Sequence, residues 1–444
     1  RRAGDRRAQP RRRRGRLSMG VDVTRLANGV TVVTHAMPHL ESVAVGLWIG
    51  AGARSERASE HGISHLLEHM AFKGTRRRNA RQLAEAIEAV GGEMNAETSV
   101  DHTTYYVRLL KDDLPLGIDV LGDIVSDPLL DAGELAREQH VVIQEIGAAH
   151  DVPEDWVFEL FQEAAFPGQA IGRSILGTPE SIRSHDAAAL RHFLSRHYTG
   201  PQTVLAAAGN LDHDDVVRLA ESHLRRLAME PAGAPEPASY RGGEWTEERP
   251  VQEVQIVIGL PAPSYGAPSF HAAHLFSAIL GGGMASRLFQ ELRESRGLCY
   301  SISSFYWPFA DAGLFGIQAA TSAEDVEELL PVVMEELRKM AEGATEGELR
   351  RAKAQLRSGL LMTLESPIAR AGQMGRHILI HGRPLKLEEM VEKVEAVTAA
   401  DLASVAAAAL ANPPTLAAIG PPGSLPALAD LSAEIDGRRA AVGW

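Results

Sequence analysis

The feature that most constrains the fold is an internal repeat across the two halves of the 444-residue chain. Residues 188–210 (AALRHFLSRHYTGPQTVLAAAGN) align with residues 400–422 (ADLASVAAAALANPPTLAAIGPP), 212 positions later. Each stretch predicts an amphipathic helix, a Gly/Pro turn and an apolar strand of small residues. An earlier pair, 63–67 and 272–276, aligns at an offset of 209. Chance similarity between alanine-rich helices is the alternative, but the shared order of elements favours a duplication.

The predicted elements also suggest where the domains begin and end. Alternating apolar strands followed by a helix open each half, with the strands at 31–34, 42–49 and 253–259. Residues 230–250 are rich in Pro, Gly and Glu, which is typical of an exposed linker. We therefore predict an α+β protein of two homologous α/β-sandwich-like domains, residues 19–229 and 251–444.

The basic residues are concentrated at the start of the chain. Residues 1–16 contain nine arginines and one aspartate, whereas the whole chain has a net charge of −13. The acidic body repels nucleic-acid phosphates, so we expect no nucleic-acid partner. We expect residues 1–18 to be a disordered extension before a natural start at Met19. A nucleic-acid-binding arm and an organellar presequence are the alternatives for this segment.

Composition excludes several other classes of protein. The sequence has no apolar run of about 18 residues, so we expect no membrane span. Cys299 is the single cysteine, which excludes an internal disulfide framework and a Cys-rich zinc module. We expect Cys299 to be a small buried hydrophobic residue. Without a secretory signal, the expected location is the bacterial cytoplasm, with the mitochondrial matrix as the alternative.

The strongest chemical signal is the pentapeptide His65-Leu66-Leu67-Glu68-His69. Histidines at i and i+4 project from one face of a helix, so both imidazoles can bind one metal ion. Glu68 lies beside that face, where its carboxylate can reach a water on the metal. This is the inverted zinc-protease motif H-x-x-E-H. A surface helix that merely carries histidines is the alternative interpretation.

A third ligand is expected from another helix, because catalytic zinc sites use three protein ligands and one open position. Residues 133–149 (GELAREQHVVIQEIGAA) predict such a helix. Glu138 and Glu145 are seven residues apart, so both carboxylates lie on one face. Acids on a partly apolar helix are costly to bury without a cation. A solvated acidic face is the alternative, but the neighbouring histidine helix favours a metal site.

The runs HGISHLLEHMAFKGT and REQHVVIQEI together resemble the pitrilysin–insulysin family of zinc metallopeptidases, in particular its mitochondrial processing peptidase branch and bacterial relatives. The resemblance extends from about Asp22 to Gly420. It implies one Zn²⁺ per chain, with the metal ligands His65, His69 and Glu145. It further implies Glu68 as the general base and Glu138 as a nearby acid that supports catalysis without binding zinc.

The second half supplies the expected substrate-binding residues. Arg293 and Tyr300, in GMASRLFQELRESRGLCYSISS, match the family's arginine and tyrosine that reach the substrate beside the zinc. The resemblance implies that Tyr300 stabilises the oxyanion and that Arg293 holds the peptide backbone. By the repeat register, His65 corresponds to His274, Glu68 to Ser277 and His69 to Ala278. We therefore expect no metal site in the second half and a core position for His274.

Two further segments resemble substrate-binding features of the family. Residues 94–99 predict an edge strand, onto which an extended peptide adds through Asn95 and Ala96. An ordinary solvated edge strand is the alternative. Gly281, Gly282 and Gly283 are similar to a shortened glycine-rich loop, although a helix-terminating turn explains them equally well.

The expected function is zinc-dependent endopeptidase activity on unfolded or presequence-like peptides, which two facing domains enclose in a chamber. A non-catalytic or partner-dependent subunit of a processing-peptidase-like heterodimer is the alternative. The presence of all five acidic and histidine residues of the site disfavours a non-catalytic chain. Because this chain carries both the zinc motif and the Arg/Tyr pair, we expect a self-sufficient homodimer.

Overall fold

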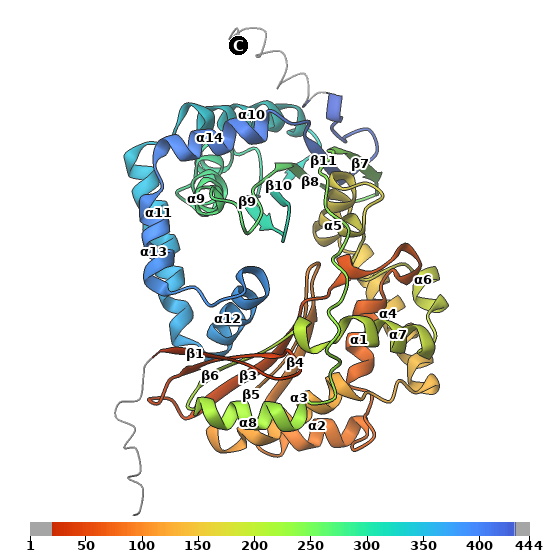
Figure 1. The fold of residues 1–444 in the computed structure, drawn as a ribbon. Helices are drawn as coiled ribbons and strands as arrows, with labels where there is room; N and C mark the ends of the chain where they lie inside the picture. The colour runs from red at the N-terminus through yellow and green to blue at the C-terminus, as the bar shows by residue number, and fades with distance from the viewer. Residues whose placement is uncertain (1–19, 430, 432–444) are drawn as a thin grey trace, which may run out of the picture.

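The computed structural model describes residues 20–429 and residue 431. The predicted extension 1–18 and the expected start at Met19 lie outside the described residues. Two halves face each other, with the N-terminal half below and the C-terminal half above (Figure 1). Among the described residues, no helix is long and apolar enough to cross a membrane.

The first sheet belongs to the N-terminal half and has the strand order β1-β2-β6-β3-β5-β4. Its strands are β1 (Val21–Arg25), β2 (Thr31–Ala36), β3 (Ser42–Ile49), β4 (Glu93–Thr98), β5 (Thr103–Leu110) and β6 (Thr203–Gly209). The central strands β3 and β6 are apolar on both faces and almost wholly buried. Both faces of the sheet are therefore covered by helices, and β4 is left at one edge.

The second sheet belongs to the C-terminal half and has the order β7-β11-β8-β10-β9. Its strands are β7 (Gly243–Glu248), β8 (Glu253–Pro261), β9 (Ser301–Pro308), β10 (Gly313–Ser322) and β11 (Thr415–Gly420). This order repeats β2-β6-β3-β5-β4 of the first sheet, including one parallel pair, β2–β6 or β7–β11, in each. The predicted duplication of an α+β domain is confirmed.

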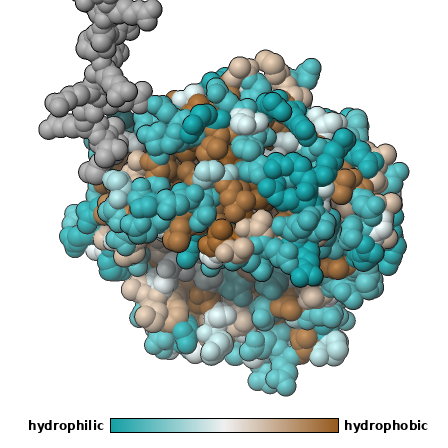
Figure 2. Space-filling model, turned by 90° about the horizontal axis from the view of Figure 1, so that it is seen from below, coloured by the Kyte–Doolittle hydropathy of each residue, from teal (hydrophilic) through white to brown (hydrophobic). Residues whose placement is uncertain are grey.

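Helices surround each sheet. The N-terminal half contains α1 (Ile63–Ala71), α2 (Ala80–Glu88), α3 (Leu114–Ser126), α4 (Ala132–His150), α5 (Pro153–Ala165), α6 (Pro179–Ser184), α7 (Ala187–His197) and α8 (His213–His223). The C-terminal half contains α9 (Phe270–Gly281), α10 (Val326–Glu342), α11 (Glu346–Met362), α12 (Pro367–His381), α13 (Leu387–Ala396) and α14 (Ala399–Leu410). The face seen from below is mostly hydrophilic, with hydrophobic residues gathered near its centre (Figure 2).

The two halves exchange one helix each. α5 follows the helices of the N-terminal half but packs on strands β7, β8 and β11 of the second sheet. In return, α12 packs on β2, β3 and β6 of the first sheet. Glycines allow both close approaches, since a side chain at Gly259 would collide with Phe161 and one at Gly375 would collide with Trp48. Each sheet is thus covered partly by the other half, and the two halves form one unit.

The segment between the halves is only partly a linker. Residues 243–248 of the expected 230–250 linker form β7, which pairs in parallel with β11. The buried Arg54 guanidinium also joins the halves, because it contacts Asp101 in the β4–β5 turn and Asp311 in the β9–β10 turn. It further donates to the Glu236 carbonyl at 2.9 Å. These contacts fix the position of one half against the other.

Candidate metal and active site

Helix α1 carries the motif residues, and its apolar side packs into the core of the N-terminal half. Ile63, Leu66, Leu67 and Met70 are at most 1 % exposed, which fits the predicted buried helix. At its N-terminus the buried Glu56 carboxylate accepts hydrogen bonds from the backbone N–H groups of Gly62 and Ser64, both at 2.8 Å. These donors have no partner within a helix, so Glu56 fixes the end of the motif helix.

His65, His69 and Glu145 converge at one point between α1 and α4. One carboxylate oxygen of Glu145 lies 3.7 Å from His65 Nε2 and 3.5 Å from His69 Nε2. One ligand atom from each residue lies within 4.8 Å of the others, and no other such group exists within the described part of the chain. Tetrahedral zinc with bonds of 2.0–2.1 Å separates its ligands by roughly 3.3 Å, so this donor set is close to that geometry.

The protonation state of His65 suits a metal site. Burial, followed by the nearby His69, lowers the pKa of His65 to about 4, so the imidazole is neutral at pH 7. A neutral imidazole offers the lone pair that a metal requires. The Nδ1 atom of His65 is buried and has no hydrogen-bond partner among the described residues.

Glu138 contacts His69 but is not part of the His65–His69–Glu145 group. Its carboxylate lies 3.1 Å from His69 Nδ1 and accepts an ion-pair contact from Lys73 Nζ at 2.7 Å. The side chain of Glu138 is 7 % exposed, against 43 % for Glu145. The arrangement matches the carboxylate–histidine–metal pattern in which the outer acid orients the ring. Of these two acids on α4, only Glu145 contacts both Nε2 atoms.

Glu68 faces the edge strand of the first sheet. Thr98 Oγ1, at the end of β4, donates a hydrogen bond of 2.5 Å to the Glu68 carboxylate. Burial raises the pKa of Glu68, against the opposing effects of the Thr98 hydrogen bond and of His69. Asn95 and Ala96 lie on β4, which pairs only with β5 among the described strands. One edge of β4 is therefore available for an added strand beside Glu68.

Arg293 and Tyr300 are brought together in the second half, before β9. The Arg293 guanidinium lies 5.7 Å from the Tyr300 ring and 4.6 Å from the Phe289 ring. Arg293 belongs to a π-helical stretch, Phe289–Ser295, and Tyr300 is 76 % exposed. Within residues 20–429, no hydrogen bond or ion pair joins either side chain to the His–His–Glu group. Arg293 and Tyr300 therefore contact each other but do not contact the His65–His69–Glu145 group.

The second half differs at the positions that match the motif. Ser277 replaces Glu68 and hydrogen-bonds Ser304 Oγ at 3.1 Å, inside the domain. His274 packs edge-on against Tyr306 and lines a cavity, so it is a half-buried wall residue rather than a fully buried core residue. Gly282 caps the C-terminus of α9, as a helix-terminating turn does. Cys299 is buried in the second core, as expected.

Three residues of the site were not found by sequence reasoning. Glu56 lies outside the spacing of a capping box, and Lys73 and Thr98 carry no motif of their own. Only their position after folding gives them a role. An acid a few residues before a glycine at a helix start is the one signal that points to Glu56.

The described residues contain one His–His–Glu group, in one half of a duplicated fold, and this arrangement is typical of two-domain metallopeptidases. Residues 31–179 match the insulinase family, peptidase family M16, and residues 184–356 match the peptidase M16 inactive domain. The chain belongs to peptidase family M16.

Curated relatives and solved structures agree with this assignment. An uncharacterized zinc protease of Rickettsia bellii is 35 % identical over 401 residues, covering 90 % of this chain and 97 % of the relative. One from Bacillus subtilis is 32 % identical over 400 residues, covering 90 % and 98 %. Two solved structures share the fold. A peptidase M16 inactive domain from Pseudomonas fluorescens has a TM-score of 0.84 at 23 % sequence identity, covering 90 % of this chain and 98 % of that one. A protease from Helicobacter pylori has a TM-score of 0.83 at 21 % identity, covering 90 % of this chain and 99 % of that one.

Proposed function

We propose that the protein is a zinc-dependent endopeptidase that hydrolyses unfolded or presequence-like peptides. The observation that carries the proposal is the convergence of His65 Nε2, His69 Nε2 and a Glu145 carboxylate oxygen beside the Glu68 carboxylate. Two imidazoles and one carboxylate form a donor set that suits Zn²⁺. The relatives named as zinc proteases support the same metal. We propose one Zn²⁺ per chain, held by His65, His69 and Glu145.

Several side chains of the protein then have separate roles in hydrolysis. When bound, zinc would supply a water of pKa ~7 and polarise the scissile carbonyl. Glu68 accepts the proton of the attacking water on its carboxylate and passes it to the leaving amine. The Thr98 hydroxyl holds the Glu68 carboxylate in position. Glu138, anchored by Lys73, holds the His69 ring through Nδ1.

The substrate is proposed to bind as an added strand. Its backbone pairs with the free edge of β4 at Asn95 and Ala96, which places the scissile bond beside Glu68. Arg293 holds the peptide backbone and the Tyr300 hydroxyl donates a hydrogen bond to the developing oxyanion. Tyr300 is exposed and belongs to the opposite half, so in this role the peptide lies between the two halves. Only an unfolded chain then fits between them.

The proposal extends to assembly and location. The zinc motif and the Arg293/Tyr300 pair are on one chain, so we propose a homodimer that needs no second kind of subunit. We propose the bacterial cytoplasm as its compartment, since the curated relatives described above are bacterial. A single inactive monomer in size-exclusion chromatography would contradict the homodimer.

The test is cleavage of a quenched, basic peptide of about 15–25 residues by the wild type, Glu68→Gln and Glu88→Gln. Glu68→Gln keeps the two histidines and should retain zinc, yet lose about 10²–10⁴-fold in kcat because the general base is gone. Glu88 is an exposed acid of α2, so Glu88→Gln is a control of equal charge change. A chelator should abolish activity, and added zinc should restore it. Full activity of Glu68→Gln would contradict the mechanism, and zinc-loaded but inactive wild type would favour the non-catalytic alternative.

A further inference from the structure

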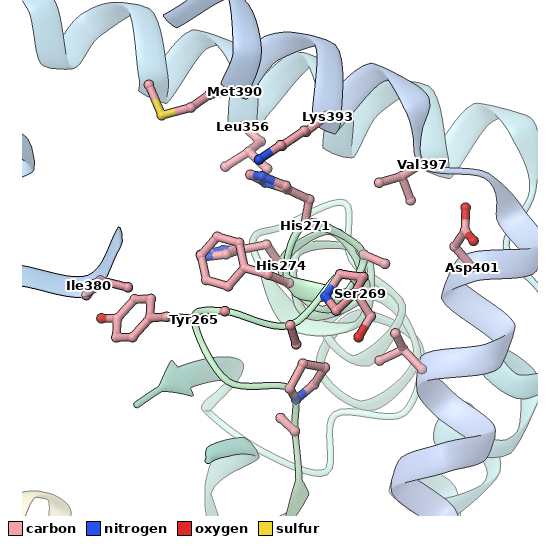
Figure 3. A pocket seen from close by; sticks show the side chains of 18 of the residues that line it. Tyr265, Ser269, His271, His274, Leu356, Ile380, Met390, Lys393, Val397 and Asp401 are labelled. Carbon is pink, nitrogen blue, oxygen red and sulfur yellow. The ribbon is translucent and has the colours of Figure 1, made fainter. Parts of the chain in front are cut away.

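A large cavity lies away from the metal cluster, in the C-terminal half. Its volume is about 1140 Å³, above the usual range for a small-molecule site, and it opens to solvent. It lies between α9, α13 and α14 on one side and α12 on the other (Figures 1 and 3). Much of its wall is apolar and includes Pro263, Phe270, Ile380, Leu385, Met390 and Val397. An occupant must therefore present an apolar body.

The charged groups of the wall are mainly cations. Arg376 of α12 is exposed to the cavity and has no carboxylate partner among the described residues. Lys393 also lines the wall and, in Figure 3, extends toward His271. Lys393 and Arg383 share the single carboxylate of Glu389, so one positive charge of this group is not balanced.

A further cation lies buried behind the same wall. Arg370 of α12 is 4 % exposed and donates to His35 Nδ1 at 3.0 Å and to Gln373 Oε1, but to no carboxylate among residues 20–429. Burial lowers its pKa, which reflects the cost of a charge without a partner. Gln373 itself lines the cavity. Arg370 and Arg376 thus add positive potential on the α12 side.

The acids and histidines near the cavity do not cancel this potential. Asp401 is the one acid that lines the wall among the described residues, and it is already used as the cap of α14, where it accepts the Thr398 N–H. Burial and then neighbouring positive groups lower the pKa of His271 and of His377 to about 4. Neutral His377 accepts the Leu385 N–H at Nδ1, so its Nε2–H is left as a donor.

These features define the chemistry of the occupant. Cations and N–H donors on an apolar wall bind a compact anion that is attached to an apolar body. The cavity does not suit a metal, because its histidines do not gather around one point in the described structure. α12 is the helix that packs on the sheet of the metal-binding half. A ligand held there lies between that sheet and the C-terminal half.

We propose that this cavity binds the C-terminal carboxylate and the last apolar side chains of the peptide substrate, with Arg376 pairing with the carboxylate. The inference rests on the proposed peptidase function and adds a substrate class, namely peptides with a free, apolar C-terminus. Arg376 acts in substrate recognition and takes no part in bond cleavage. The Arg376 wall therefore offers the substrate a contact that is separate from the His65, His69 and Glu145 group.

The test uses two quenched peptides of one sequence with leucine at the end, one a free acid and one a C-terminal amide. The wild type should show a KM about 10- to 100-fold higher for the amide with little change in kcat, since one charge-assisted contact is lost. Arg376→Gln should cleave both with the same high KM. Arg357→Gln, which removes an exposed arginine of α11 outside the cavity, should behave as the wild type.

Direct binding separates failure of this inference from failure of the peptidase function. Fluorescence anisotropy of a labelled copy of each peptide on the full-length wild type needs no cleavage, so it stands even if no peptide is cut. Tighter binding of the acid that depends on Arg376 supports the site. Equal binding or cleavage of acid and amide by the wild type overturns it. Binding of laurate at this site without any preference between the two peptides also overturns it, and indicates a lipid anion as the occupant.

Discussion

Among single residues, Glu138 links His69 of the His–His–Glu group to the ammonium group of Lys73. Its carboxylate holds His69 Nδ1 at 3.1 Å and Lys73 Nζ at 2.7 Å. Glu138→Gln keeps the shape but removes the charge that orients the ring, and outer partners of this kind contribute 10–100-fold. We expect zinc affinity or kcat/KM to fall by about that factor, measured by metal titration and peptide cleavage. Glu134→Gln, in the first turn of the same helix where Glu134 pairs with Arg137, should change neither.

Sequence reasoning found those site residues that recur at a spacing typical of a metal-binding helix. His65, Glu68 and His69 share one short motif, whereas the helix 133–149 offered both Glu138 and Glu145, and the family resemblance favoured Glu145. Glu56 and Thr98 could not be predicted, because each acts through one hydrogen bond that forms only after distant segments meet. Sequence periodicity reports which face of an element is buried but not which polar atom meets which.

At the level of elements, the start of α1 depends on a glycine. Gly62 has φ +83°, and a side chain there would approach Ile182 Cδ1 at 2.7 Å and Gly177 Cα at 2.8 Å. We expect Gly62→Ala to destabilise the protein by about 1–3 kcal/mol through backbone strain and crowding, measured by denaturant unfolding. Gly359→Ala is the matched control, because Gly359 is exposed in α11 with nothing within 4 Å, and should stabilise by about 0.5–1 kcal/mol. Equal effects of the two changes would contradict this account.

Glu348, at the start of α11, makes the free energy of unfolding depend on pH. Hydrogen bonds from Arg287 lower the pKa of Glu348 from 4.5 to about 2. The charged form is therefore favoured in the folded state. Its contribution to stability is complete above pH 4.5 and is lost as the pH falls toward 2. We expect Glu348→Gln to lower the unfolding midpoint at about pH 6 but to have a smaller effect at about pH 2.5. A constant difference between the two proteins across this range would contradict the assignment.

Elements were predicted best where one face is clearly apolar. The helix–turn–strand units at 188–210 and 400–422 form α7–β6 and α14–β11, as expected. β7 was missed inside the presumed linker, because its sequence GEWTEE is largely exposed and has no apolar alternation. An edge strand that pairs on one side needs little burial, so its sequence looks like a loop.

For the whole molecule, the exchange of α5 and α12 could not be read from the repeat. The duplication predicts which segments are equivalent but not which sheet each one covers. The apolar side of α12 meets Trp48 of the first sheet, whereas that of α5 meets Gly259 of the second. The stability of each half is therefore tied to its position against the other.

Arg54 is expected to hold that position. Its buried guanidinium lies 2.6 Å from Asp311 and 3.4 Å from Asp101, two carboxylates on hairpin turns of opposite halves. Arg54→Met leaves both acids without a cation, and we expect a loss of about 3 kcal/mol, the lower end for a broken buried pair because Asp311 is partly exposed. Arg54→Met/Asp311→Asn should recover part of the loss, since it removes one unpaired charge. Denaturant unfolding gives the stability, and small-angle scattering should show the halves moving apart. An unchanged unfolding midpoint and radius of gyration would show that helix exchange alone holds the halves together.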